Sequence, residues 1–163
     1  MTITTFSKKR EEQLEEKVKG KIARGVLKEN DSDLKALGIV SPYNNFYNLS
    51  MAHFTRADRP VEACDFMQRV YSFESENVAI CTLYIYNDLA EKGLIELEDF
   101  EVFLDTCLRM YQSAEMLTAL GEIYLSTFND FQKALNIGRQ LKIMYGDITL
   151  AKQVLGRLCE AAE

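Results

Sequence analysis

The sequence is poor in the residues that mark β-structure. It holds two prolines, Pro42 and Pro60, among 163 residues, and no Asn-Gly or Asp-Gly pair, so tight β-hairpins have no signal in it. Apolar residues recur instead at spacings of three and four, as they do on the buried face of an amphipathic helix. We therefore predict an all-α fold.

Residue types that serve catalysis and metal binding are also scarce. His53 is the only histidine, and the motifs GxxxxGK[ST], GxGxxG and GxSxG are absent, which excludes sites with two histidine ligands and the common nucleotide and serine-nucleophile sites. A single histidine on a helix face is more often a packed or half-exposed side chain than a base. We predict no catalytic residue, no metal and no cofactor. An enzyme with a site of carboxylates alone is the remaining catalytic alternative.

Long apolar runs and paired cysteines are missing as well. No run approaches the roughly 18 apolar residues that a membrane-spanning helix needs, and the start of the chain, MTITTFSKKREEQ, has no apolar core of a secretory signal. None of the four cysteines lies in a CxxC motif, and we expect buried, reduced side chains. They are Cys64, Cys81, Cys107 and Cys159. A cytoplasmic protein without membrane insertion is predicted.

Charge is unevenly distributed. Residues 8–29 carry eight basic and five acidic side chains, a net of +3, whereas the whole chain carries −6, which leaves −9 for the remainder. An acidic body suits nucleic acid poorly, because phosphate neutralisation dominates that affinity. The densest acidic run lies between Asp88 and Asp105, where only Lys92 opposes it in sequence. It is either a solvated face or a surface that steers a basic partner.

The clearest helical pattern lies in residues 114–141. Leu117, Leu120 and Tyr124 share one helical face, a polar turn covers residues 127–130, and the periodicity resumes after it. This predicts two antiparallel helices. The spacing of Gly121, Tyr124 and Ala134 resembles the tetratricopeptide repeat, in which a small residue admits the second helix, an aromatic ring fills the space between hairpins and an alanine lies at the crossing.

Two earlier segments fit the same unit. One hairpin is predicted from residues 44–56, a turn at 57–59 and a second helix starting at Pro60, and another from residues 76–110 with its turn at Lys92-Gly93. Tyr47, Tyr84 and Leu117 then take equivalent places at steps of 37 and 33 residues, close to the roughly 34 of this repeat. The prediction is an α-α superhelix of three hairpins, residues 44–163, closed by a capping helix at about 148–162.

Residues 1–43 are predicted as a separate part. A charged helix runs from Ser7 to about Leu27, and a linker helix capped by Asp31 or Ser32 follows it. One narrow apolar stripe runs along the charged helix, and it either packs on its own domain or forms an oligomerisation seam of a homodimer. The stripe consists of Leu14, Val18, Ile22 and Val26.

The first helix of each hairpin should line the hollow side of such an array and contact a protein or peptide partner. The predicted partner-binding residues are Asn45, Asn48, Ala52, Thr55 and Arg56 in the first hairpin, Thr82, Ile85, Leu89 and Lys92 in the second, and Thr118, Glu122 and Leu125 in the third. The two asparagine amides either bond a peptide backbone or simply open their helix.

The whole layout is similar to the tetratricopeptide-type chaperones of bacterial type III secretion, with the nearest local match in YNLSMAHFTRADRPVEA, residues 47–63. The resemblance implies a cytoplasmic chaperone or adaptor that holds a translocator-type protein without catalysis. A structural or regulatory subunit that assembles through its N-terminal helix is the alternative.

Overall fold

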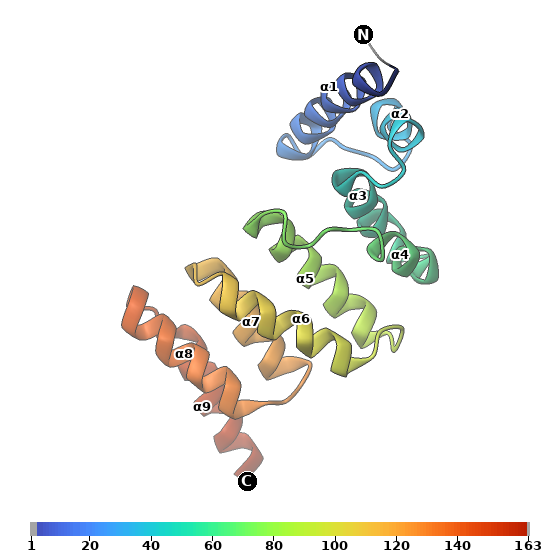
Figure 1. Ribbon diagram of the computed structural model, residues 1–163. Coiled ribbons are helices and arrows are strands. Elements are labelled where there is room, and N and C mark those ends of the chain that lie inside the picture. Colours follow the sequence, from blue (N-terminus) through green and yellow to red (C-terminus); the bar gives the residue numbers. More distant parts are fainter. Residues whose placement is uncertain (1–2, 163) are drawn as a thin grey trace. The chain divides into compact units, whose positions relative to one another are not determined.

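The computed structural model describes residues 3–162, and the regular structure within this range is entirely helical (Figure 1). This confirms the all-α prediction. The helices are α1 (Ile3–Ala23), α2 (Ser32–Val40), α3 (Asn45–Thr55), α4 (Pro60–Met67), α5 (Glu76–Glu91), α6 (Leu97–Met110), α7 (Ala114–Ser126), α8 (Phe131–Tyr145) and α9 (Thr149–Ala162).

Short polar side chains set most of the helix starts. The side chains of Asp31, Ser75, Ser113 and Asp130 accept hydrogen bonds from the first backbone N–H groups of α2, α5, α7 and α8, respectively. Pro60 stands at the start of α4, where its missing N–H leaves no intrahelical bond unmade. These boundaries lie within a few residues of those predicted from the sequence.

The first helix differs from its prediction at both ends. It begins before Ser7, which therefore lies inside the helix instead of capping it. It ends at Ala23, short of Leu27, because Gly25 adopts a left-handed φ of +68°. The N–H groups of Gly25 and Val26 then donate to the carbonyls of Ile22 and Lys21, the pattern that closes a helix with glycine.

The chain divides into two compact units, Met1–Ser72 and Phe73–Glu163. The division does not fall at residue 43, where the sequence placed it, because α3 belongs to the first core. Its residues Tyr47, Met51 and Phe54 pack against a buried cluster from α1 and α2. That cluster consists of Leu14, Val18, Leu34 and Leu37. The first predicted hairpin thus contributes side chains to the core that α1 and α2 form.

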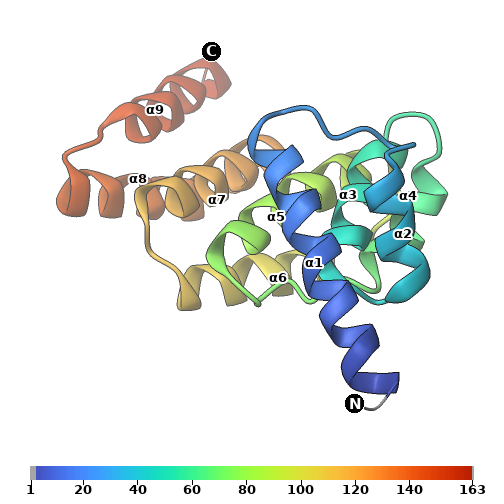
Figure 2. The ribbon, with the colours of Figure 1, turned by 90° about the horizontal axis from the view of Figure 1, so that it is seen from above.

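In the second unit, α7 is the central helix and packs against α5, α6, α8 and α9 (Figure 2). Leu117, Leu120 and Tyr124 on α7 are all fully buried, as their periodicity predicted, and so is Ala134 on α8. Gly121 makes room for more than the second helix of its hairpin. A Cβ atom there would lie 2.1 Å from Leu150 of α9 and 3.3 Å from Ile137 of α8, so this glycine admits Leu150 to the core.

Two glycines with opposite surroundings provide a matched test of this packing. A Cβ atom on Gly138 would lie 3.0 Å from the backbone nitrogen of Ala151, whereas one on Gly156 would meet nothing within 4 Å. Both residues are helical, so leucine gains the same helix propensity at each. We expect Gly138→Leu to cost about 1–3 kcal/mol of unfolding free energy through overpacking, and Gly156→Leu to gain up to about 1 kcal/mol. Urea denaturation followed by circular dichroism measures both; equal effects would contradict the close α8–α9 crossing.

Candidate functional site

The second unit contains a groove between α7 and α9, with a volume of about 510 Å³. We call it the α7–α9 groove. Its walls are Glu122, Leu125 and Ser126 on α7, and Gln153, Gly156, Arg157 and Glu160 on α9. The α9 residues recur every three or four positions and so form one helical face, which extends about 10 Å at 1.5 Å per residue. On α7 the lining residues lie within about one helical turn, so the groove is a short depression between the two helices.

Core packing aims this face of α9 at α7. Leu150 and Val154 are 3% and 0% exposed and anchor α9 in the core, and Leu150 occupies the space that Gly121 leaves open. Gln153 and Arg157 follow these two anchors by three residues, so they lie on the adjacent part of the helix surface. Leu125, only 3% exposed, forms an apolar floor beneath the polar walls.

The groove is lined by charges that the described structure does not neutralise internally. Three charged residues of the groove are exposed and take part in no salt bridge within residues 3–162: Glu122, Arg157 and Glu160. Solvated, unpaired side chains of this kind can form charge-assisted hydrogen bonds with a ligand. Gly156 keeps the space between them open, because it has no side chain.

Carboxylates of α7 act electrostatically on side chains of α5. Tyr84 on α5 is 47% exposed, and its pKa is raised, first by partial burial and then by the carboxylates of Glu122 and Glu115 on α7. The same helix carries Cys81, which is exposed. Partial burial of its thiol and the charge of Glu115 raise its pKa. The charges of Glu115 and Glu122 on α7 thus act on Tyr84 of α5, a helix that packs against α7.

The predicted partner-binding residues of the first hairpin serve their own unit instead. The Asn45 amide donates to the Tyr71 carbonyl at 2.7 Å and accepts from the Tyr71 N–H, which ties α3 to the end of the unit. Asn48 is fully buried and donates to the carbonyls of Pro42 and Asn44, each at 2.9 Å. A partner cannot reach Asn48 in this structure, so its expected contact with a peptide backbone is corrected to a contact with its own chain.

Two of the other three residues predicted in this hairpin also lie in the interior of their own unit. Ala52 and Thr55 are fully buried, and the Thr55 hydroxyl donates to the Met51 carbonyl at 2.7 Å. Arg56 is half-buried, and its charge adds to partial burial in lowering the pKa of His53. His53 itself is exposed on α3, and the centre of its ring lies 5.5 Å from that of Phe54.

The second and third hairpins divide the predicted residues differently. Thr82, Ile85 and Leu89 on α5 are at most 3% exposed, so they do not offer a surface to a partner. Lys92 is exposed and pairs with Asp88 at 3.2 Å. On α7, Glu122 and Leu125 do line the α7–α9 groove, while Thr118 is half-buried on the same helix. The sequence analysis thus named two of the three α7 residues that line the groove, without Ser126, and the three α5 residues that it named are buried.

The stripe on α1 is also shared between core and surface. Leu14 and Val18 are fully buried within the first unit, whereas Ile22 and Val26 are 46% and 53% exposed. The structure thus uses the first half of the stripe for packing within the chain. Only the second half, near the end of α1, is available to another molecule.

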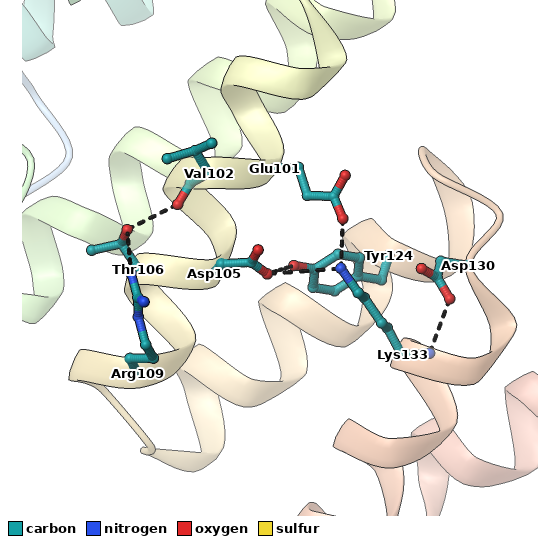
Figure 3. A network of polar contacts seen from close by, with 8 residues as sticks. All are labelled: Glu101, Val102, Asp105, Thr106, Arg109, Tyr124, Asp130 and Lys133. Carbon is teal, nitrogen blue, oxygen red and sulfur yellow. Dashed lines mark hydrogen bonds and ion pairs between the residues drawn. The ribbon is translucent and has the colours of Figure 1, made fainter.

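A polar network missed by the sequence analysis joins α6, α7 and α8 (Figure 3). The fully buried Tyr124 donates its hydroxyl proton to Asp105 at 2.7 Å. Lys133 lies 5.1 Å from the centre of the Tyr124 ring, pairs with Glu101 at 2.5 Å and lies 3.9 Å from Asp105. Within the acidic run, Glu101 and Asp105 on α6 are therefore opposed by Lys133 from α8, whereas Lys92 pairs with Asp88 on α5. The network around Lys133 joins α6, α7 and α8.

Cysteine burial follows the prediction only in part. Cys107 is buried, which raises its pKa to about 12, and Cys64 is half-buried. Cys81 and Cys159 are exposed, because they lie on the outer faces of α5 and α9 and not on their core faces. Among residues 3–162, no group of three or more His, Cys, Asp or Glu side chains is placed to hold a metal ion.

Comparison with known proteins gives no relative. No family model, no curated protein and no solved structure matches the chain. Within the described residues, none of the helices has the length and apolarity that crossing a membrane requires. The functional argument therefore depends on the geometry and charge of this chain alone.

Proposed function

We propose that this chain is a non-catalytic protein-binding module that holds a segment of a partner protein in the α7–α9 groove. In this proposal, the hairpins α3–α4, α5–α6 and α7–α8 act as tetratricopeptide-like units, and the protein serves as a cytoplasmic chaperone or adaptor of the bacterial secretion type. The supporting observation is the groove itself. It lies between two helices, is lined by the largely buried Leu125 and carries charged side chains that form no salt bridge within the described residues.

The dimensions favour a peptide segment as the occupant. A groove between two helices can accept side chains of an extended or helical segment, with pockets providing affinity and charged contacts fixing its register. A volume of about 510 Å³ also lies within the ordinary range of ligand sites, roughly 300–1,000 Å³.

The test uses a random peptide library displayed on phage and panned against the immobilised full chain. We expect enriched peptides that bind in solution with a Kd of about 1 μM, which corresponds to about −8 kcal/mol. Gly156→Trp should weaken their binding at least tenfold, because the indole occupies the space that Gly156 leaves open. Fluorescence anisotropy with labelled peptides measures both.

Asn136→Trp provides the matched control, since Asn136 is an exposed, neutral residue on α8 outside the groove. It should leave peptide binding unchanged. Enrichment of no peptide, or equal binding to the Gly156→Trp protein, would show that the groove is not a peptide site.

A further inference from the structure

We propose that the segment held in the α7–α9 groove is basic, with lysine or arginine side chains that reach Glu122 on the α7 wall and Glu160 on the α9 wall. This inference rests on the proposed function and adds the chemistry of the partner to it. The occupant is a protein segment, and the negative charge of the groove and of its surroundings favours a segment with positive net charge.

The first argument is the charge of the second unit. Residues 73–163 contain seven Lys and Arg against fifteen Asp and Glu, a net charge of −8, whereas residues 1–72 contain twelve against ten, a net charge of +2. A negative unit attracts basic segments during diffusional encounter and repels acidic ones. The acidic character predicted for the body of the chain is thus confined to the unit that contains the groove.

The second argument is local. Two carboxylates, from Glu122 on α7 and Glu160 on α9, line the groove together with one guanidinium, from Arg157 on α9. Glu115 adds a further carboxylate on α7, close enough for its charge and that of Glu122 to act on Tyr84. Because these carboxylates are not neutralised by ion pairs within the described chain, an incoming cation meets them with their full charge.

The third argument concerns Tyr84. An exposed aromatic ring with carboxylates nearby suits a guanidinium or ammonium group, because the ring face attracts the cation while a carboxylate accepts its hydrogen bonds. The chain itself uses this arrangement elsewhere. Lys133 lies over the Tyr124 ring while pairing with Glu101, and Lys19 lies 4.4 Å from the centre of the Phe46 ring. At Tyr84, no lysine or arginine among the described residues lies over the ring, and a partner's side chain would supply the cation.

The experiment starts from the peptides enriched against the full chain at about 0.15 M salt, where long-range attraction is screened beyond about 8 Å. Their net charge is the first readout, and we expect a clear excess of lysine and arginine over aspartate and glutamate. The second readout is the Kd of the tightest peptide, measured with charge variants of the full chain.

The variants are expected to change affinity in opposite directions. Glu122→Gln and Glu160→Gln should each weaken binding about threefold, the size expected for a solvent-exposed charge pair, and Arg157→Gln should strengthen it by a similar factor. Glu98→Gln is the matched control. Glu98 is an exposed carboxylate on α6 outside the groove, so its removal changes net charge equally and should leave the Kd unchanged.

The possible outcomes separate this inference from the proposed function. Basic peptides that show this pattern of signs, and that Gly156→Trp excludes, support both. Acidic or neutral peptides that Gly156→Trp excludes overturn the basic partner and leave the peptide groove standing. Equal losses with Glu98→Gln and Glu122→Gln also overturn it, because they indicate diffuse attraction. Peptides that Gly156→Trp does not exclude overturn the proposed function, and the inference with it.

Discussion

Replacing Tyr124 with alanine is expected to destabilise the protein by about 3–5 kcal/mol, the largest effect of a single substitution in the second unit. The Tyr124 side chain is fully buried, its ring lies 5.6 Å from that of Phe128, and its hydroxyl bonds Asp105 at 2.7 Å. Truncation leaves a cavity at the junction of α6, α7 and α8. Chemical denaturation followed by far-UV circular dichroism measures the loss.

Tyr124→Phe separates the hydroxyl from the ring. It should cost about 1.5–3 kcal/mol, because a hydrogen bond to a carboxylate is stronger than a neutral one. Asp105 keeps its contact with Lys133 in this variant, which limits the loss. A cost close to zero would show that solvent or Lys133 satisfies Asp105 equally well without the tyrosine.

The same pair of proteins predicts a pH dependence. Burial and the hydrogen bond to Asp105 raise the pKa of Tyr124 well above its ordinary value near 10. A raised pKa in the folded state means that Tyr124 stabilises fully below about pH 10 and loses this contribution as the pH rises beyond it, because the unfolded chain then releases the proton more readily. Between pH 8 and pH 11 the wild-type protein should therefore lose stability faster than Tyr124→Phe. Parallel losses would contradict the assignment.

Local sequence signals predicted most of the helices. The stretch of residues 114–141 gave α7, its turn and most of α8, since Leu117, Leu120 and Tyr124 bury one face and Ser113 caps the start. Pro60 marked the start of α4, because proline fixes φ at a helical value. Gly93 marked the turn after α5, because its positive φ of 75° favours glycine. These features depend on neighbours within one or two helical turns, which a single sequence displays directly.

Contacts between distant segments were not visible in the same way. Lys133 neutralises Glu101 from 32 positions away, and Asn45 bonds Tyr71 from 26 positions away, so neither partner is apparent from local spacing. The domain boundary was misplaced for this reason, because α3 is recruited by a core that begins at Leu14. The α9 wall of the groove was missed because Gln153, Arg157 and Glu160 resemble the solvated face of any terminal helix. Their position near α7 depends on the packing of Leu150 against Gly121, a contact between distant segments.

Leu14→Ala is expected to cost about 2–5 kcal/mol of unfolding free energy, whereas Ile22→Ala should stay within about 0.5 kcal/mol of the wild type. Both residues lie on the apolar stripe of α1, and a helix that assembles through this stripe would need both. Leu14 is fully buried among Val18, Leu34 and Leu37, while Ile22 is 46% exposed. The difference follows from the first unit using one end of the stripe as its own core.

The measurement is urea denaturation at two protein concentrations together with sedimentation equilibrium. A core role for Leu14 makes its loss independent of concentration, because folding within one chain involves no second molecule. A homodimer built on the stripe would instead show stability that rises with concentration, and Ile22→Ala would then cost nearly as much as Leu14→Ala. The two substitutions thus decide between packing within the chain and assembly of subunits. Both residues lie on the same stripe of one helix, but only Leu14 is buried by its own chain.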